Sequence, residues 1–117
     1  PRTPMCMNKR TKGTLLWVAV AAVAAHKAVF LAGDWNAEPD SEPLAAVRGF
    51  MKMLSPQNRR TYTGFKVHPP ESVYCIDYIA VDSGHAGDFE IGISYVVSDN
   101  VTSDHNPVVV SVKKSGR

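Results

Sequence analysis

Apolar runs alternate with polar, turn-forming segments along the whole chain. An Ala-rich run predicts a helix over residues 14–26 that is apolar on most sides. Shorter apolar runs predict four strands, at Ala28–Gly33, Val73–Val81, Ile91–Val97 and Pro107–Val112. The run Ala28–Gly33, which Gly33 ends, predicts a buried strand. The run Val73–Val81 is apolar on both faces apart from Asp77, which is typical of a strand buried on both sides.

A second helix is predicted after the turn-rich segment 34–43. Asp40 or Ser41 can cap it, and Pro43 is tolerated in its first turn. It should end before Pro56, because Pro disfavours helical geometry at the preceding residue. Its predicted apolar face consists of Leu44, Val47, Phe50, Met51 and Leu54. With a long loop over 55–72, the order of elements predicts an α/β or α+β layered domain.

Composition and charge narrow the picture only a little. The chain has 117 residues, enough for one domain, and its 44% hydrophobic content suits a globular fold. A net charge of +2 does not by itself indicate a polyanionic partner. Cys75 lies in a predicted buried strand and Cys6 in a polar segment, and no disulfide-scaffold pattern supports a bond between them.

The N-terminal segment allows two interpretations. Residues 1–13 are polar and are expected to form a flexible segment. The basic cluster there, followed by the apolar run Leu15–Ala25, is similar to a secretory signal. We favour a buried helix, because a strand that needs covering follows almost at once. The run is too short to span a membrane.

Three places hold residues suited to chemistry. Gly33, Asp34 and Asn36 come at the end of the first predicted strand, where open sheets present polar groups to ligands. The alternative there is an Asx turn that simply leaves the strand. Asp77 stands alone inside an apolar strand, so it needs a partner such as a histidine ring or backbone donors.

The third place is the segment 103–107, Ser-Asp-His-Asn-Pro, before the last predicted strand. Its adjacent Asp104 and His105 could place one group on a metal ion and the other on a substrate oxygen. The alternative is an Asn-Pro turn that opens the strand. Each place is weak alone, and the ordered set of all of them is much stronger.

The ordered set resembles the endonuclease/exonuclease/phosphatase superfamily, which has a DNase I-like fold. The resemblance runs from about Ala28 to Val112. It implies a divalent-metal-dependent phosphoester hydrolase that uses Mg²⁺ or Mn²⁺. It also implies the C-terminal half of an α/β/β/α sandwich, here essentially one mixed sheet with flanking helices. The blocks that carry it are Gly33–Asn36 with the following 37–41, Thr61–Phe65, Ile76–Ile79 and Ser103–Pro107.

The resemblance also implies a role for each matching residue. Asp34 is similar to the group that orients and deprotonates the attacking water, and Asn36 to a hydrogen-bond donor to the phosphate. Asp104, together with Asp34, is expected at the metal site. His105 is similar to the group that contacts a phosphate oxygen in the transition state. Asp77 is similar to the partner that fixes its ring, which matches the positioning logic of Asp–His pairs.

The chain departs from the family pattern in one important respect. The family's N-terminal half supplies a metal-ligating Glu, and no Glu precedes Gly33 in this sequence. His26 is interpreted as a helix-end residue rather than a ligand. We therefore expect an incomplete domain over 14–113 with a basic tail at 114–117, whose inner sheet face is apolar and exposed unless something covers it. Such a chain would self-associate or need a missing N-terminal half.

The loop before the third block suggests substrate contacts. Arg59, Arg60, Tyr62 and Phe65 combine charge with aromatic rings near the expected cleft, and the alternative is a solvated loop. Substrates of the superfamily include nucleic acids, phospholipid head groups and small phosphates. Two other functions remain open: a catalytically incomplete fragment or pseudoenzyme that binds a phosphate or a partner, and a nucleic-acid-binding module.

Overall fold

The computed structural model describes residues 27–68, 73–98 and 102–115. The predicted helix over 14–26 and the polar segment 1–13 lie outside these residues. The described part is a small α+β domain, mostly strands with one α-helix. None of its helices is long and apolar enough to cross a membrane.

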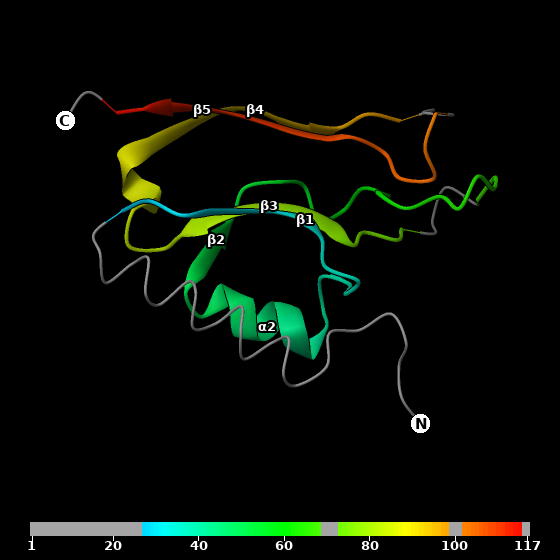
Figure 1. Cartoon of the computed structure of the whole chain (residues 1–117), viewed down its shortest axis with the longest axis horizontal. Coiled ribbons are helices and arrows are strands. Elements are labelled where there is room, and N and C mark those ends of the chain that lie inside the picture. The colour runs from blue at the N-terminus through cyan, green and yellow to red at the C-terminus, as the bar shows by residue number, and fades with distance from the viewer. Residues whose placement is uncertain (1–26, 69–72, 99–101, 116–117) are drawn as a thin grey trace.

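The described residues form two antiparallel sheets in separate layers (Figure 1). The first sheet has the order β1-β3-β2 and the second pairs β4 with β5. The bounds are β1 Phe30–Asp34, α2 Glu42–Arg48, β2 Met51–Met53, β3 Asp77–Asp82, η1 Ala86–Asp88, β4 Phe89–Val96 and β5 Val108–Lys114. In Figure 1, β4 and β5 lie above the first sheet and α2 lies below it.

The expectation of essentially one mixed sheet is wrong for the described residues. β3 lies between β1 and β2 and runs antiparallel to both, so no two neighbouring strands are parallel. Parallel neighbours need a crossover between them, but the chain leaving α2 enters β2, which pairs with β3 rather than with β1. The β4–β5 pair then forms a second layer instead of extending the first sheet.

The second predicted helix is too long. α2 ends at Arg48, and Met51 and Met53 belong to β2, where Met51 is buried and Lys52 exposed in strand alternation. Gly49 weakens any helical continuation, and pairing with β3 gives the following residues better partners. The spacing of the apolar residues fitted both structures, and tertiary pairing decided between them.

The strand predicted over Val73–Val81 is shorter at its start, because β3 begins at Asp77. The amides of Ile76 and Asp77 donate to the hydroxyl of Thr61 at 2.9 and 3.1 Å. The Thr61 side chain therefore accepts the two amides that would otherwise donate to a neighbouring strand. The other strand predictions agree with β1, β4 and β5 to within about two residues at each end.

The core lies between the first sheet and α2. Leu44, Met51, Tyr78 and Ala80 are almost completely buried there. The single proton of the Tyr78 hydroxyl is shared between the backbone carbonyls of Ala37 and Cys75, and burial raises the pKa of this phenol. Tyr78 also packs against Trp35, with ring centroids 5.0 Å apart, and so anchors the turn that follows β1.

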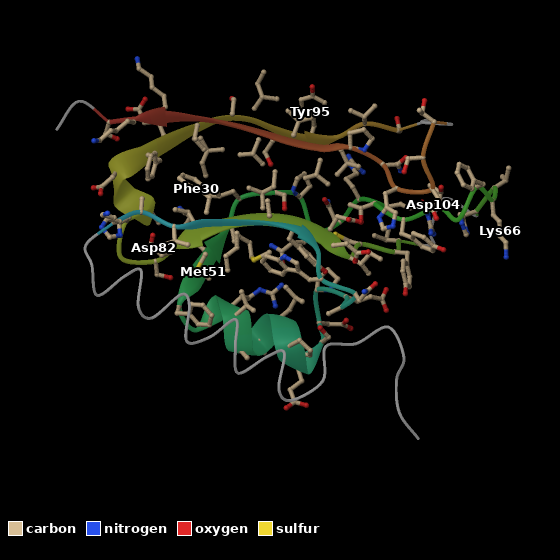
Figure 2. The ribbon with its side chains drawn as sticks, viewed as in Figure 1. Phe30, Met51, Lys66, Asp82, Tyr95 and Asp104 are labelled. Carbon is tan, nitrogen blue, oxygen red and sulfur yellow. The ribbon has the colours of Figure 1, made fainter. Side chains whose placement is uncertain are left out.

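The two sheets touch through a few specific contacts. The Phe30 and Phe89 rings meet edge to face with centroids 5.1 Å apart, and the Ser94 hydroxyl donates to the Leu54 carbonyl. The second layer therefore covers part of the face that was expected to be bare. On the outer side of that layer Tyr95 points away from the first sheet (Figure 2), and Ile93 is 59% exposed.

Candidate active site

Strand pairing brings the first two acidic residues together. Asp34 ends β1, Asp77 begins β3, and the two residues are direct partners in the antiparallel register. Trp35 holds the exit from β1 in place, because its amide donates to the Ile76 carbonyl at 2.8 Å and its ring is buried. Two carboxylates from separate segments therefore meet at one end of the first sheet.

His105 completes the group from the segment before β5. Its Nδ1 lies 2.9 Å from the Asp77 carboxylate, and its Nε2 lies 3.7 Å from the Asp34 carboxylate. The side chains are 31% exposed for His105, 36% for Asp34 and 15% for Asp77. Ligand atoms of all three residues lie within 4.8 Å of one another. The imidazole is therefore held between two carboxylates and still reaches solvent.

The electrostatics favour a protonated imidazole. Burial opposes the charged ring, but the hydrogen bond to Asp77 and the charges of Asp77, Asp34 and Asp104 outweigh it and raise the pKa of His105. With Asp77 bound at Nδ1, a protonated ring presents its Nε2–H on the side of Asp34. Such a ring can stabilise negative charge that develops on a bound oxygen.

A loop holds His105 from its other side. Tyr62 forms an isolated antiparallel bridge with His105, and the two rings meet edge to face with centroids 4.9 Å apart. Tyr74 packs on Tyr62 in turn, at 5.7 Å. The Ser103 hydroxyl accepts the His105 amide at 3.1 Å. The ring position is therefore fixed by aromatic packing as well as by Asp77.

Asp104 is not part of the close group that the side chains of Asp34, Asp77 and His105 form. It is half-buried, adjacent to His105, and its charge contributes to the raised pKa of that ring. Its carbonyl accepts the amides of Thr63 and Gly64. Its predicted role at a metal ion stays a prediction.

Asn36 occupies a strained position beside Asp34. Its φ of 48° lies in the left-handed region, which Asn tolerates better than most residues. Its amide donates to the Asp34 carboxylate at 2.9 Å, so the Asx turn considered from the sequence is formed and the strand does not continue. Among the described residues, the side-chain oxygen of Asn36 is buried without a hydrogen-bond partner. A buried amide oxygen left in this way is costly unless a ligand or water satisfies it.

The group suits a hard divalent cation. It offers carboxylate oxygens from Asp34 and Asp77. The imidazole is not counted as a ligand, because its Nδ1 is bonded to Asp77 and its raised pKa favours the protonated ring. Oxygen-rich sets of this kind favour Mg²⁺ or Mn²⁺. The donor chemistry therefore fits such an ion.

The predicted substrate contacts lie on the loop beside His105. Arg59 is exposed, and Tyr62 is half-buried against His105. Phe65 is 68% exposed and has a φ of 61°, an unusual conformation for an aromatic residue. Its amide donates to the Thr63 hydroxyl, which in turn donates to the Asp104 carbonyl.

Sequence reasoning gave no role to Thr61, which is fully buried and contacts the backbone of Asp77. The block Thr61–Phe65 belongs to the resemblance, but a lone Thr in a loop carries no chemical signal. The pairing of His85 with Asp82 was not predicted either: the Nδ1 of His85 lies 2.6 Å from the carboxylate of the fully buried Asp82.

The fold and the site together define a class: a layered α+β domain with carboxylates and a histidine gathered at the strand ends. The comparisons name the family. Residues 8–105 match the endonuclease/exonuclease/phosphatase family, and the chain belongs to that family. No curated protein matches the chain.

Two solved structures share the fold. A functionally unknown conserved protein from Enterococcus faecalis V583 is 22% identical with a TM-score of 0.70. An endonuclease/exonuclease/phosphatase from Bacteroides vulgatus is 17% identical with a TM-score of 0.71. Each likeness covers 93% of this chain and 46% of the solved chain, so this chain spans less than half of their length.

Proposed function

We propose that this chain carries the water-activating and charge-stabilising part of a divalent-metal-dependent phosphoester hydrolase. The observation that carries the proposal is the placement of His105 between Asp77 and Asp34. Family membership supports the class of reaction. Nucleic acids, phospholipid head groups and small phosphates are the substrate classes we consider.

Each residue has a distinct role in this proposal. Asp34 accepts a proton from the attacking water, whose oxygen forms a bond to phosphorus as the bond to the leaving oxygen breaks. The leaving oxygen takes a proton from solvent. The protonated His105 donates from Nε2 to a phosphate oxygen, and Asp77 keeps the ring in that orientation. Asn36 lies next to Asp34 and donates to the phosphate.

Asp34 and Asp104 are the residues we propose as metal ligands, with Mg²⁺ or Mn²⁺ as the ion. The ion would supply charge neutralisation at the phosphate. Tyr62 packs against His105, and Arg59 and Phe65 lie on the same loop; these three residues would hold the rest of the substrate. Arg59 would contribute positive charge, and the two rings would contribute stacking surface.

The test is hydrolysis of a chromogenic phosphodiester, and of the matching monoester, by the purified chain with Mn²⁺ or Mg²⁺. Activity should disappear with a chelator and in Asp34→Ala. Activity that survives both controls would contradict the proposal, and so would a folded chain that is inactive even when Mn²⁺ is bound.

A second candidate is a catalytically incomplete module that binds a phosphate or a partner. It is favoured by the position of Asp104 outside the close group of Asp34, Asp77 and His105. Calorimetric titration with Mn²⁺ separates the two functions. The hydrolase predicts binding that Asp104→Ala weakens, and the binding module predicts no Mn²⁺ binding at all.

We also propose a partner, which would cover exposed apolar side chains on β4. Ile93 and Tyr95 are 59% and 44% exposed on β4, and large apolar side chains in a row are typical of a contact surface. A second copy of the chain or the N-terminal half of the domain would cover them. Light scattering that showed a clean monomer with cooperative thermal unfolding would contradict this.

A further inference from the structure

Thr61 is a buried polar residue that none of the proposed catalytic steps uses. Its side chain is fully buried, and its hydroxyl oxygen accepts two backbone amides, Ile76 at 2.9 Å and Asp77 at 3.1 Å. A hydroxyl has two acceptor positions, so both are filled by this pair of donors. Thr61 therefore fixes the backbone from which the Asp77 side chain projects.

The backbone around Thr61 contacts the other half of the site. The Thr61 carbonyl accepts the Asn106 amide at 2.7 Å, and the Thr63 amide donates to the Asp104 carbonyl at 2.8 Å. The Thr63 hydroxyl also donates to that carbonyl, at 3.1 Å. The residues on both sides of His105 are therefore bonded to the segment 61–63.

Thr61 takes part in both sets of contacts. Asp77 belongs to the first sheet, while His105 precedes β5 of the second sheet. The carboxylate and the imidazole must stay 2.9 Å apart although they come from different layers. Thr61 bonds to the Asp77 backbone through its side chain and to the Asn106 backbone through its carbonyl.

We propose that Thr61 is a positioning residue that sets the Asp77–His105 distance by clamping β3 to the segment 104–106. The inference rests on the proposed hydrolase function, because its catalytic consequence requires that His105 acts on substrate. It assigns no contact with substrate to Thr61. The clamp acts on the backbone of Asp77 and Asn106, so its loss shifts a hydrogen bond of the site without removing any reacting group.

Two substitutions of Thr61 separate the shape of its side chain from its hydrogen-bond acceptor. Thr61→Val keeps the shape and removes the acceptor, and Thr61→Ser keeps the acceptor. Ser55→Ala is the matched control: Ser55 is also buried and also accepts an amide of β3, that of Ile79 at 2.9 Å. Among the described residues, no backbone hydrogen bond joins Ser55 to the segment 104–106; the Ser55 amide donates to the Ile79 carbonyl within the first sheet. A purely structural role predicts the same outcome for Thr61→Val and Ser55→Ala.

The experiment measures kcat and KM for the chromogenic phosphodiester together with the ¹⁵N spectrum of the His105 ring. Thr61→Val should lower kcat by about 10–100-fold with little change in KM, since small misplacements of catalytic groups cost this much. It should also shift the ring ¹⁵N signals, because the bond to Asp77 changes. Thr61→Ser and Ser55→Ala should stay within about threefold of wild type and keep the ring signals.

Several outcomes would overturn the clamp: unchanged ring signals and kcat in Thr61→Val, equal losses in Ser55→Ala, or no rescue by Thr61→Ser. If the wild-type chain is inactive, the proposed function fails, and the ring signals of the same variants still decide the clamp. If Thr61→Val does not fold, Thr61→Ala replaces it, since it also removes the acceptor of the Ile76 and Asp77 amides. Unchanged ring signals in that variant would then reject the proposal.

Discussion

The two ends of β3 carry the same pair of residue types in different surroundings. Asp77 begins the strand and lies 2.9 Å from the Nδ1 of His105, and Asp82 ends it and lies 2.6 Å from the Nδ1 of His85. The two pairs lie far apart, since Figure 2 shows Asp82 and Asp104, the neighbour of His105, at opposite ends of the molecule.

The surroundings separate a structural pair from a candidate catalytic one. Asp82 is fully buried, and its other oxygen accepts the Val29 amide at 2.7 Å. Its histidine is only three residues away, in the turn that follows the strand. His105 comes from 28 residues away, remains 31% exposed and faces a second carboxylate, Asp34. An Asp–His pair alone therefore says little, whereas exposure and a further carboxylate indicate chemistry.

The largest expected contrast lies in activity. His105→Gln should lower kcat/KM for the chromogenic phosphodiester by about 10³-fold, because it removes a group that stabilises transition-state charge. His85→Gln should leave kcat/KM within about threefold of wild type, because His85 lies at the other end of the strand. Steady-state kinetics with Mn²⁺ measures both variants. Equal losses in the two would show that the comparison has no functional meaning.

The sequence predicted much of this site because its residues stand at ends of recognisable strands. The sequence alone indicates Asp34, Asp77 and His105, and the structure brings them together. Their roles stay predictions. The burial of Asp82 could not be predicted, because Asp-Ser-Gly-His has the composition of an exposed turn. The hydrogen bonds of Thr61 could not be predicted either, because they join it to backbone atoms that are distant in sequence.

A contrast of intermediate size is expected in stability. Asp82→Asn should lower the free energy of unfolding by about 2 kcal/mol, because it replaces a buried, charge-assisted hydrogen bond. Asp77→Asn should cost less than about 1 kcal/mol, because Asp77 and His105 are both partly solvated. Urea unfolding followed by tryptophan fluorescence compares the two. A larger loss in Asp77→Asn would reverse the assignment of structural and catalytic pairs.

The effect of Asp82→Asn on the free energy of unfolding should depend on pH. Burial opposes ionisation of Asp82, but the Val29 amide and His85 outweigh it, so its pKa in the folded state is lowered. Its contribution is therefore present above the unfolded value of about 3.9 and is lost as pH falls through the folded value. The difference in stability between wild type and Asp82→Asn should stay constant near neutral pH and close only in acid. A difference that closes above pH 6 would contradict this sign.

The fold was predicted well where apolar runs had one interpretation. The strands before Asp34 and after Asn106 are where the pattern placed them. The segment around Met51 was wrong, because its spacing fits a helix and a short edge strand equally well. Pairing with β3 supplied information that no local pattern contains.

The smallest contrast concerns two glycines, one beside each pair. Gly33 precedes Asp34 and has a φ of 140°, whereas Gly87 follows His85 by two residues and has no such strain; an added Cβ would meet nothing within 4 Å at either. Gly33→Ala should therefore lower the free energy of unfolding by about 1 kcal/mol through backbone strain. Since the strain falls next to Asp34, it should also lower kcat severalfold. Gly87→Ala should be neutral or stabilising by up to about 1 kcal/mol, because it only restricts the unfolded chain. Urea unfolding and kinetics on the two variants measure this difference. If Gly33→Ala were as harmless as Gly87→Ala in both, the conformation at Gly33 would not be what directs the Asp34 carboxylate toward His105.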